Sequence, residues 1–220
     1  MKRQTGITDI FKNNEFVLIV AILIIGTIFT ILKPNFFSIN NLYGILVSNS
    51  YLAIMAMGVL VVLISGGIDI SFTATATVAQ YVMATIIINN GGNMFLAFLI
   101  AGLVGLALGS INAILVYTLK VPSIIVTIST LNAFYGLLIF ITGGKWLYGF
   151  PMWFMDKNLV SFQRADGSLF GLSMPITLLV AAVIVTWIIL RFTTLGRKVY
   201  ALGGNPEAAR RIGINIFRTQ

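Results

Sequence analysis

The sequence contains no cysteine and no histidine, and it has few charged residues. The absence of cysteine excludes disulfides and thiolate chemistry, and the absence of histidine removes the commonest metal ligand and the usual general base. Only 9% of the 220 residues are charged, whereas soluble domains carry about a quarter. The apolar body also lacks the pair of acids that general acid–base catalysis would need. We therefore expect no catalytic residue, no metal and no cofactor.

Long apolar runs take the place of the missing charges, since 58% of the residues are hydrophobic. Runs of this length predict an all-α, polytopic transmembrane helix bundle with the lipid bilayer as its solvent. The second and third spans are separated by a helix break at Gly66-Gly67, and a less apolar stretch, 143–173, precedes the last span. The six expected spans are Phe16–Leu32, 42–65, 71–88, Met94–Leu119, 122–142 and 174–190.

The basic residues gather next to these runs on one side of the expected bundle, which is the positive-inside pattern of a membrane protein. That distribution argues against a nucleic-acid partner. With a cytoplasmic N-terminus and six crossings, the tail is also cytoplasmic. If the segment 66–71 were a re-entrant turn, the number of crossings would change and the two ends would no longer be placed on the same side of the membrane. The cytoplasmic side would hold Lys2, Arg3, Lys12, Lys120, Arg191, Arg197, Lys198, Arg210, Arg211 and Arg218, and the outer side Lys33, Lys145, Lys157 and Arg164.

The segment 193–214 is the only long basic stretch after the apolar body, and it predicts a short, strongly punctuated helix. Asn205 is a good N-cap, and Pro206 suits the first helical position. Glu207 places a negative charge in the first turn, and two arginines place positive charge in the last turn. Gly213 suits a left-handed cap. So short a helix is unstable alone and must lean on the membrane domain or on a partner.

This segment carries a specific resemblance. Glu207-Ala208-Ala209, followed by three residues and Gly213, resembles the EAA-x3-G signature of ABC-importer permeases. Its flank is similar to the version in the ribose/simple-sugar and autoinducer-2 permease family, as are GGIDIS at 66–71 and TGGKWLYGFP at 142–151. The resemblance implies a cytoplasmic coupling segment, 191–220, in which Asn205 and the EAA-x3-G residues dock on an ATPase subunit. The alternative is a basic helix lying on anionic lipid.

Family membership implies further partners: a second permease subunit, identical or different, and an extracytoplasmic sugar-binding protein. Gly144-Lys145 lacks the spacing of a phosphate loop, so ATP hydrolysis would belong to the ATPase partner. The expected function is therefore a non-enzymatic permease domain, 1–220, in the inner membrane, importing a monosaccharide-like solute such as ribose or autoinducer-2. Such permeases have more spanning helices than six, and we expect this chain to be the N-terminal part of a longer permease, or an inactive fragment.

Asp69 is the only acidic residue within the apolar body, and an acid at membrane depth is a functional candidate. It could cap the third span, with Ser71 assisting. It could carry protons, which would make the chain an ATP-independent proton-coupled carrier or channel. It could also contact a sugar hydroxyl. The preceding Gly66-Gly67 and the following helix favour the cap.

Neutral polar side chains recur at helical spacing within the spans. They could line a pathway for a polyhydroxylated solute, or they could form interhelical hydrogen bonds worth about 0.6 kcal/mol each. Gly102, Gly105 and Gly109 also give small-xxx-small spacings typical of close helix packing. The polar candidates are Asn49 in the second span, Thr73, Thr77 and Gln80 in the third, and Ser123, Thr127 and Thr130 in the fifth, with Asp69 between the second and third.

Overall fold

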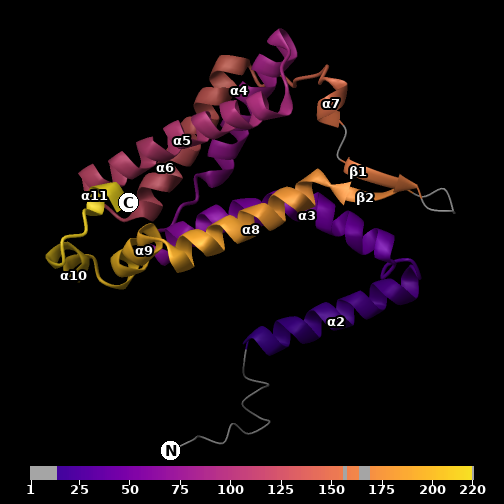
Figure 1. The fold of residues 1–220 in the computed structure, drawn as a ribbon, viewed down its shortest axis with the longest axis horizontal. Coiled ribbons are helices and arrows are strands. Elements are labelled where there is room, and N and C mark those ends of the chain that lie inside the picture. Colours follow the sequence, from indigo (N-terminus) through magenta and orange to yellow (C-terminus); the bar gives the residue numbers. More distant parts are fainter. Residues whose placement is uncertain (1–13, 156–157, 164–168, 220) are drawn as a thin grey trace, which may run out of the picture. The chain divides into compact units, whose positions relative to one another are not determined.

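The computed structural model describes residues 14–155, 158–163 and 169–219, and these form long helices with one β-hairpin (Figure 1). The expected all-α architecture is confirmed. Five of the described helices are long and apolar enough to cross a membrane, whereas the apolar run Phe16–Leu32 is shorter. The five are α3 (Ile39–Ile64), α4 (Phe72–Asn90), α5 (Met94–Leu119), α6 (Ser123–Thr142) and α8 (Met174–Phe192).

The five long helices lie where the apolar runs predict them, with ends that shift by a few residues. Pro122, the first residue of the expected fifth span, lies just before α6 as its N-cap residue and makes no side-chain cap hydrogen bond. The expected break between the second and third spans is confirmed, because α3 ends at Ile64 and α4 begins at Phe72. A sixth crossing by the first helix stays a prediction. The basic residues Lys2, Arg3, Lys12, Lys157 and Arg164, which enter the orientation count, lie outside the described residues.

The chain divides into two compact units, residues 1–49 and residues 50–220. The described part of the first unit contains α2 (Asn14–Leu32) and the beginning of α3. Phe29 of α2 stacks on Phe36 in the connecting turn, with ring centroids 5.3 Å apart. The side-chain nitrogen of Asn41 donates to the Phe36 carbonyl at 2.7 Å. This hydrogen bond ties the turn to the start of α3.

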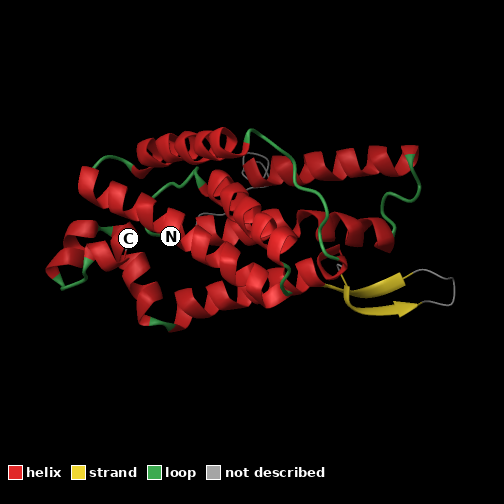
Figure 2. Ribbon diagram, turned by 90° about the horizontal axis from the view of Figure 1, so that it is seen from above, coloured by secondary structure: helices red, strands yellow, loops and turns green. Residues whose placement is uncertain are grey.

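The second unit is built around α4, which packs against both α5 and α6, all three labelled in Figure 1. Figure 2 shows the two strands of this unit as yellow arrows. The buried core at one end of this three-helix group consists of Met83, Ile87 and Ala97. Trp153 and Phe154 of the short helix α7 (Met152–Met155) pack on that core. Among the described residues, the close packing expected at Gly102, Gly105 and Gly109 is not present, because a Cβ on any of them would meet no described atom within 4 Å.

An antiparallel hairpin precedes α8 and was not expected from the sequence. It pairs β1 (Asn158–Gln163) with β2 (Leu169–Ser173), and Ser161 faces Gly171 in the register. The alternation of polar and apolar residues extends over too few positions to stand out from the less apolar stretch around it. The hairpin leads directly into α8 and so defines where that span begins.

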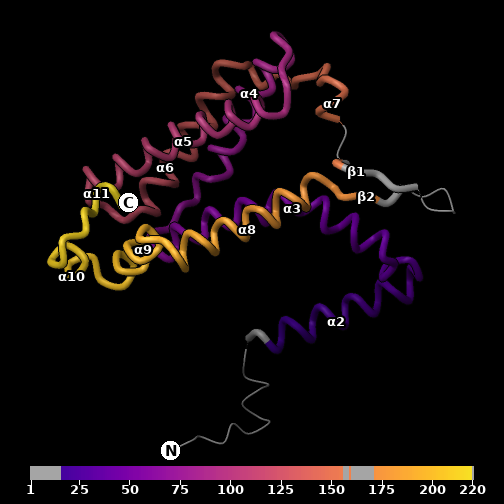
Figure 3. Tube along the Cα trace, viewed as in Figure 1, coloured from indigo at the N-terminus to yellow at the C-terminus, as the bar shows by residue number. Residues whose placement is uncertain are grey.

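The basic tail folds into three short helices, which Figure 3 shows at the yellow end of the trace. They are α9 (Thr194–Gly204), α10 (Pro206–Arg211) and α11 (Ile216–Thr219). α10 is the expected short helix, whereas α9 was not expected. α9 buries Val199 and Leu202 and packs against α8, α10 and α11. Phe217 of α11 makes an edge contact with Tyr117 of α5, with ring centroids 4.9 Å apart.

Candidate functional site

The start of α10 has the cap geometry that the sequence predicts. The Asn205 side-chain oxygen accepts a hydrogen bond from the Ala208 amide at 3.0 Å, and Pro206 occupies the first turn. The Asn205 amide in turn donates to the Ala201 carbonyl at 3.1 Å. Asn205 therefore closes α9 and opens α10, and it is the only residue between the two helices.

The end of α10 also agrees with the sequence prediction. Gly213 has a φ of +85°, which is the left-handed conformation that glycine adopts without strain. Its amide donates to the Arg210 carbonyl at 3.0 Å, and the Ile214 amide donates to the Ala209 carbonyl at 3.0 Å. This pair of hydrogen bonds is a Schellman cap. Both ends of α10 are thus stabilised by residues within or next to it.

The outer face of α10 is charged and exposed. Glu207, Arg210 and Arg211 are exposed, whereas Ala209 is buried on the opposite side. No carboxylate of a described residue lies within ion-pair distance of these arginines. A capped helix with one buried alanine and an exposed pattern of one acid and two bases can dock on a partner surface without refolding.

The second polar centre is the break between α3 and α4, and Asp69 lies within it. The Asp69 Oδ1 accepts hydrogen bonds from the Ser71 amide and from the Ser71 hydroxyl, each at 2.7 Å. Ser71 is fully buried, with an exposed fraction of 0%. Asp69 therefore accepts a backbone amide at the start of α4, as expected. The assistance expected of Ser71 is not present, because Ser71 is the N-cap residue but its side chain makes no cap hydrogen bond and donates to Asp69 instead. An acid that satisfies a buried amide stabilises the beginning of α4.

The break is also held from α6. The Ile68 amide donates to the Ser123 hydroxyl at 2.8 Å, and the Ile70 amide donates to the Thr127 hydroxyl at 3.2 Å. The Thr127 hydroxyl lies within 3.2 Å of the Ile68 carbonyl, to which it can donate. Two side chains on one face of α6 thus satisfy backbone groups that a broken helix leaves unpaired.

Asn112 of α5 completes this polar centre, and the sequence analysis missed it. Its side-chain nitrogen donates to the Ser71 hydroxyl at 2.6 Å, and the exposed fraction of Asn112 is 6%. Its Oδ1 is buried and has no hydrogen-bond partner among the described residues. A polar residue in the middle of a span with small neighbours, as in GSINA, is the only signal that could have singled it out. We call Asp69, Ser71, Asn112, Ser123 and Thr127 the break cluster.

The other predicted pathway residues do not join the break cluster. Thr73, Thr77 and Gln80 are exposed on α4, and the Thr77 hydroxyl donates to the Thr73 carbonyl at 2.8 Å. Thr130 is buried and donates to carbonyls of its own helix. Asn49 donates to the Ile45 carbonyl within α3 at 2.8 Å. The predicted set therefore separates into buried or half-buried groups that bond to backbone, three exposed groups on α4, and the exposed Asn49 on α3.

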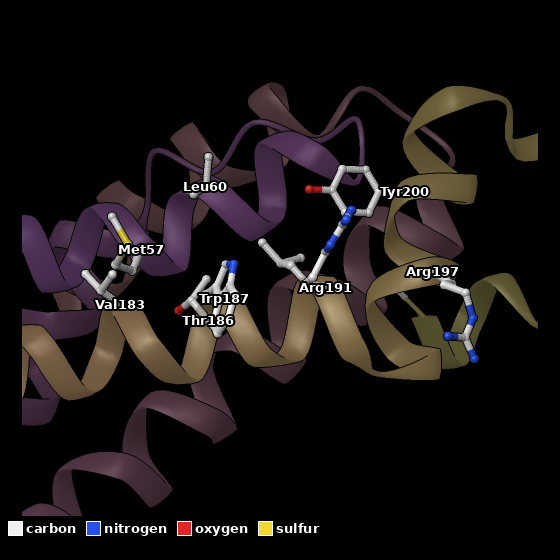
Figure 4. A pocket seen from close by; sticks show the side chains of 9 residues that line it. Met57, Leu60, Val183, Thr186, Trp187, Arg191, Arg197 and Tyr200 are labelled. Carbon is white, nitrogen blue, oxygen red and sulfur yellow. The ribbon is translucent and has the colours of Figure 1, made fainter.

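A groove of about 460 Å³ lies between α3, α8 and α9. Figure 4 shows that Arg191 extends toward the ring of Tyr200 and that Arg197 points away from it. The rest of the lining is mainly apolar and includes Met57, Leu60 and Trp187.

Long apolar helices, a polar break held between three of them and a charged tail define this chain as a multi-pass helical membrane protein. Residues 41–220 match the family described as branched-chain amino acid transport system / permease component, and the chain belongs to that family. The resemblance to sugar and autoinducer-2 permeases is confirmed by curated relatives. No solved structure matches the chain.

Two relatives illustrate the match. The chain is 31% identical over 211 residues to an autoinducer 2 import system permease protein, LsrC, of Enterobacter sp. (strain 638), covering 96% of this chain and 59% of the relative. It is 32% identical over 205 residues to the ribose import permease protein RbsC of Escherichia coli (strain K12), covering 90% of this chain and 60% of the relative. The chain thus spans about 60% of the length of these relatives.

Proposed function

We propose that this chain acts as the membrane-spanning permease subunit of an ATP-driven importer for a monosaccharide-like solute. The observation that carries the proposal is the capped helix α10, which presents Glu207, Arg210 and Arg211 to solvent in a chain of a permease family. Relatives named as ribose and autoinducer 2 import permeases support the solute class. The chain performs no covalent chemistry, and its role is to change access to a pathway.

The partners follow from this role. Within the coupling segment 191–220, Asn205 and the EAA-x3-G residues at α10 dock on a cytoplasmic ATPase. A second permease subunit completes the pathway, and a sugar-binding protein delivers the solute from outside. This assignment places both the N-terminus and the tail in the cytoplasm of a bacterial cell. The excess of lysine and arginine on that side supports the orientation.

For the solute pathway we favour the exposed face of α4. Thr73, Thr77 and Gln80 share that face, and none of their side chains bonds to another described helix. Ser123 and Thr127 are instead engaged with the backbone of the break. Neutral hydroxyl and amide groups suit a polyhydroxylated solute, because they bind it without the strong hold of a charge.

The first experiment is a detergent pull-down of the tagged chain from its native membranes. Glu207→Lys reverses the charge at the start of α10 and is expected to weaken ATPase co-purification about tenfold, or about 1.4 kcal/mol. Glu207→Gln, which removes the charge without reversing it, is expected to have a smaller effect. Unchanged co-purification of the ATPase with Glu207→Lys would contradict the docking role. Recovery of the tagged chain on anionic vesicles without any ATPase would favour the alternative that the basic helix lies on lipid.

Asp69 distinguishes the importer from the proton-coupled carrier. The Asp69 Oδ1 is occupied by both donors of Ser71, which supports a capping role. Asp69→Asn keeps an oxygen acceptor and removes the titratable group. Uptake that survives this substitution and stops on ATP depletion is expected for the importer. Uptake that survives ATP depletion and collapses in Asp69→Asn would establish the carrier.

A further inference from the structure

Helix α9 contacts its neighbours through two glycines that lie on one face, seven residues apart. A Cβ on Gly196 would overlap the carbonyl oxygens of Ile189 and Leu190 at the end of α8. A Cβ on Gly203 would overlap the Ile64 carbonyl oxygen at the end of α3 and lie 3.1 Å from the Ser65 carbonyl carbon. At both ends, therefore, α9 packs backbone against backbone.

The contact at Gly203 is reciprocal. Its partner Gly66 has a φ of +87°, and a Cβ built there would lie 3.4 Å from the Gly203 Cα. Neither residue has a side chain whose rotamer could absorb a displacement. Packed backbones of this kind move together or separate, because close-packed interiors deform little.

The contact lies between the two polar centres described above. On one side, Gly203 is two residues from Asn205, which joins α9 directly to α10. On the other side, Gly66 begins the break, where Ile68 and Ile70 are bonded to α6. A movement of α10 thus has a continuous route through α9 to the segment that connects α3 with α4.

We propose that Gly203 is a positioning residue that couples the movement of α10 to the α3–α4 break through its contact with Gly66. The inference rests on the proposed function, since it assumes that a partner moves α10. Beyond that function, the inference names the Gly203–Gly66 contact as the junction and requires that residue 203 has no Cβ.

The chain offers a matched control in the next residue. Gly204 also belongs to α9, but a Cβ there would meet no atom within 4 Å. Gly203→Ala and Gly204→Ala make the same chemical change at neighbouring positions of α9, and only the first places a Cβ against α3. In the assembled importer, Gly203→Ala is expected to lower solute uptake per ATP hydrolysed about tenfold, a usual size for coupling between sites. ATPase co-purification and hydrolysis should stay within about twofold of the parent, and Gly204→Ala should leave every readout unchanged.

A second measurement needs no partner. Because the chain has no cysteine, Ile68→Cys introduces a single thiol into the break. In the membrane-embedded chain, Gly203→Ala should raise the maleimide labelling rate at this thiol about threefold as the break loosens, and Gly204→Ala should not.

The two measurements separate the inference from the proposed function. If no ATPase associates with any variant but labelling still distinguishes Gly203→Ala from Gly204→Ala, the contact is upheld and the importer role fails. Equal labelling in the two variants overturns the inference whatever the uptake result. Loss of ATPase association together with uptake in Gly203→Ala alone would also overturn it, because the residue would then serve assembly and not coupling.

Discussion

The start of α10 and the start of α4 use the same chemistry in opposite surroundings. In each, the oxygen of an Asn or Asp side chain accepts a hydrogen bond from a nearby backbone amide, at Ala208 and at Ser71 respectively. The cap of α10 is exposed and is complete within its own segment. The cap of α4 is buried and continues through Ser71 to Asn112, a residue 41 positions further along the chain.

This difference separates a helix end that can form locally from one that forms only when other helices are in place. Water can replace a lost partner at Ala208, whereas a buried amide at Ser71 would stay unpaired. Leaving a buried donor without a partner costs about 1 to 3 kcal/mol, whereas an exposed cap contributes about 1 kcal/mol. The two caps should therefore respond differently to equivalent substitutions.

The largest effect is expected at the buried cap. Asp69→Ala removes the acceptor of both Ser71 donors and should lower the free energy of unfolding by about 2 to 3 kcal/mol. The measurement is an SDS titration of the chain in mixed micelles. Asp69→Asn retains an oxygen at the same place and should lose less than about 1 kcal/mol. Equal losses in the two variants would show that the charge matters and that the acceptor geometry does not.

An intermediate effect is expected where α6 holds the break. Thr127→Val removes a buried hydroxyl that serves Ile70 and should cost about 1 kcal/mol in the same titration. Thr77→Val makes the same change on α4, where the hydroxyl is exposed and bonded within its own helix, and should cost less than about 0.5 kcal/mol.

The same pair of variants also tests the assignment of the solute pathway. Thr77→Val should impair uptake without changing stability, because Thr77 lies on the proposed pathway face. If both variants left transport rate and apparent affinity unchanged in the assembled importer, neither threonine would belong to the pathway.

The smallest effect is expected at the exposed cap. Asn205→Ala should raise the hydrogen-exchange rate of the Ala208 amide about fivefold, which corresponds to about 1 kcal/mol. Asn205→Asp preserves the acceptor and is the control. A change in exchange at Ser71 in Asn205→Ala would contradict the view that this cap is local, and it would show that the two polar centres are linked more tightly than we propose.

Sequence reasoning worked best where structure depends on neighbours along the chain. The apolar runs located five long helices, and Asn205, Pro206 and Gly213 defined α10 to within a residue. It also identified Asp69 as a cap, because Gly66-Gly67 before it and a helix after it are local features. The same reasoning missed the β-hairpin, whose strands are short, and α9, whose apolar face is interrupted by glycines.

Local sequence patterns alone are enough to identify a multi-pass helical membrane protein with a capped, charged helix, α10. Burial of apolar runs in lipid and the satisfaction of helix ends by adjacent residues need no knowledge of distant contacts. Three contacts become visible only in the folded chain: Ser123 and Thr127 hold the break, Asn112 reaches Ser71, and Gly203 meets Gly66. Those contacts join segments far apart in the chain, and residue spacing does not encode which distant helix faces which.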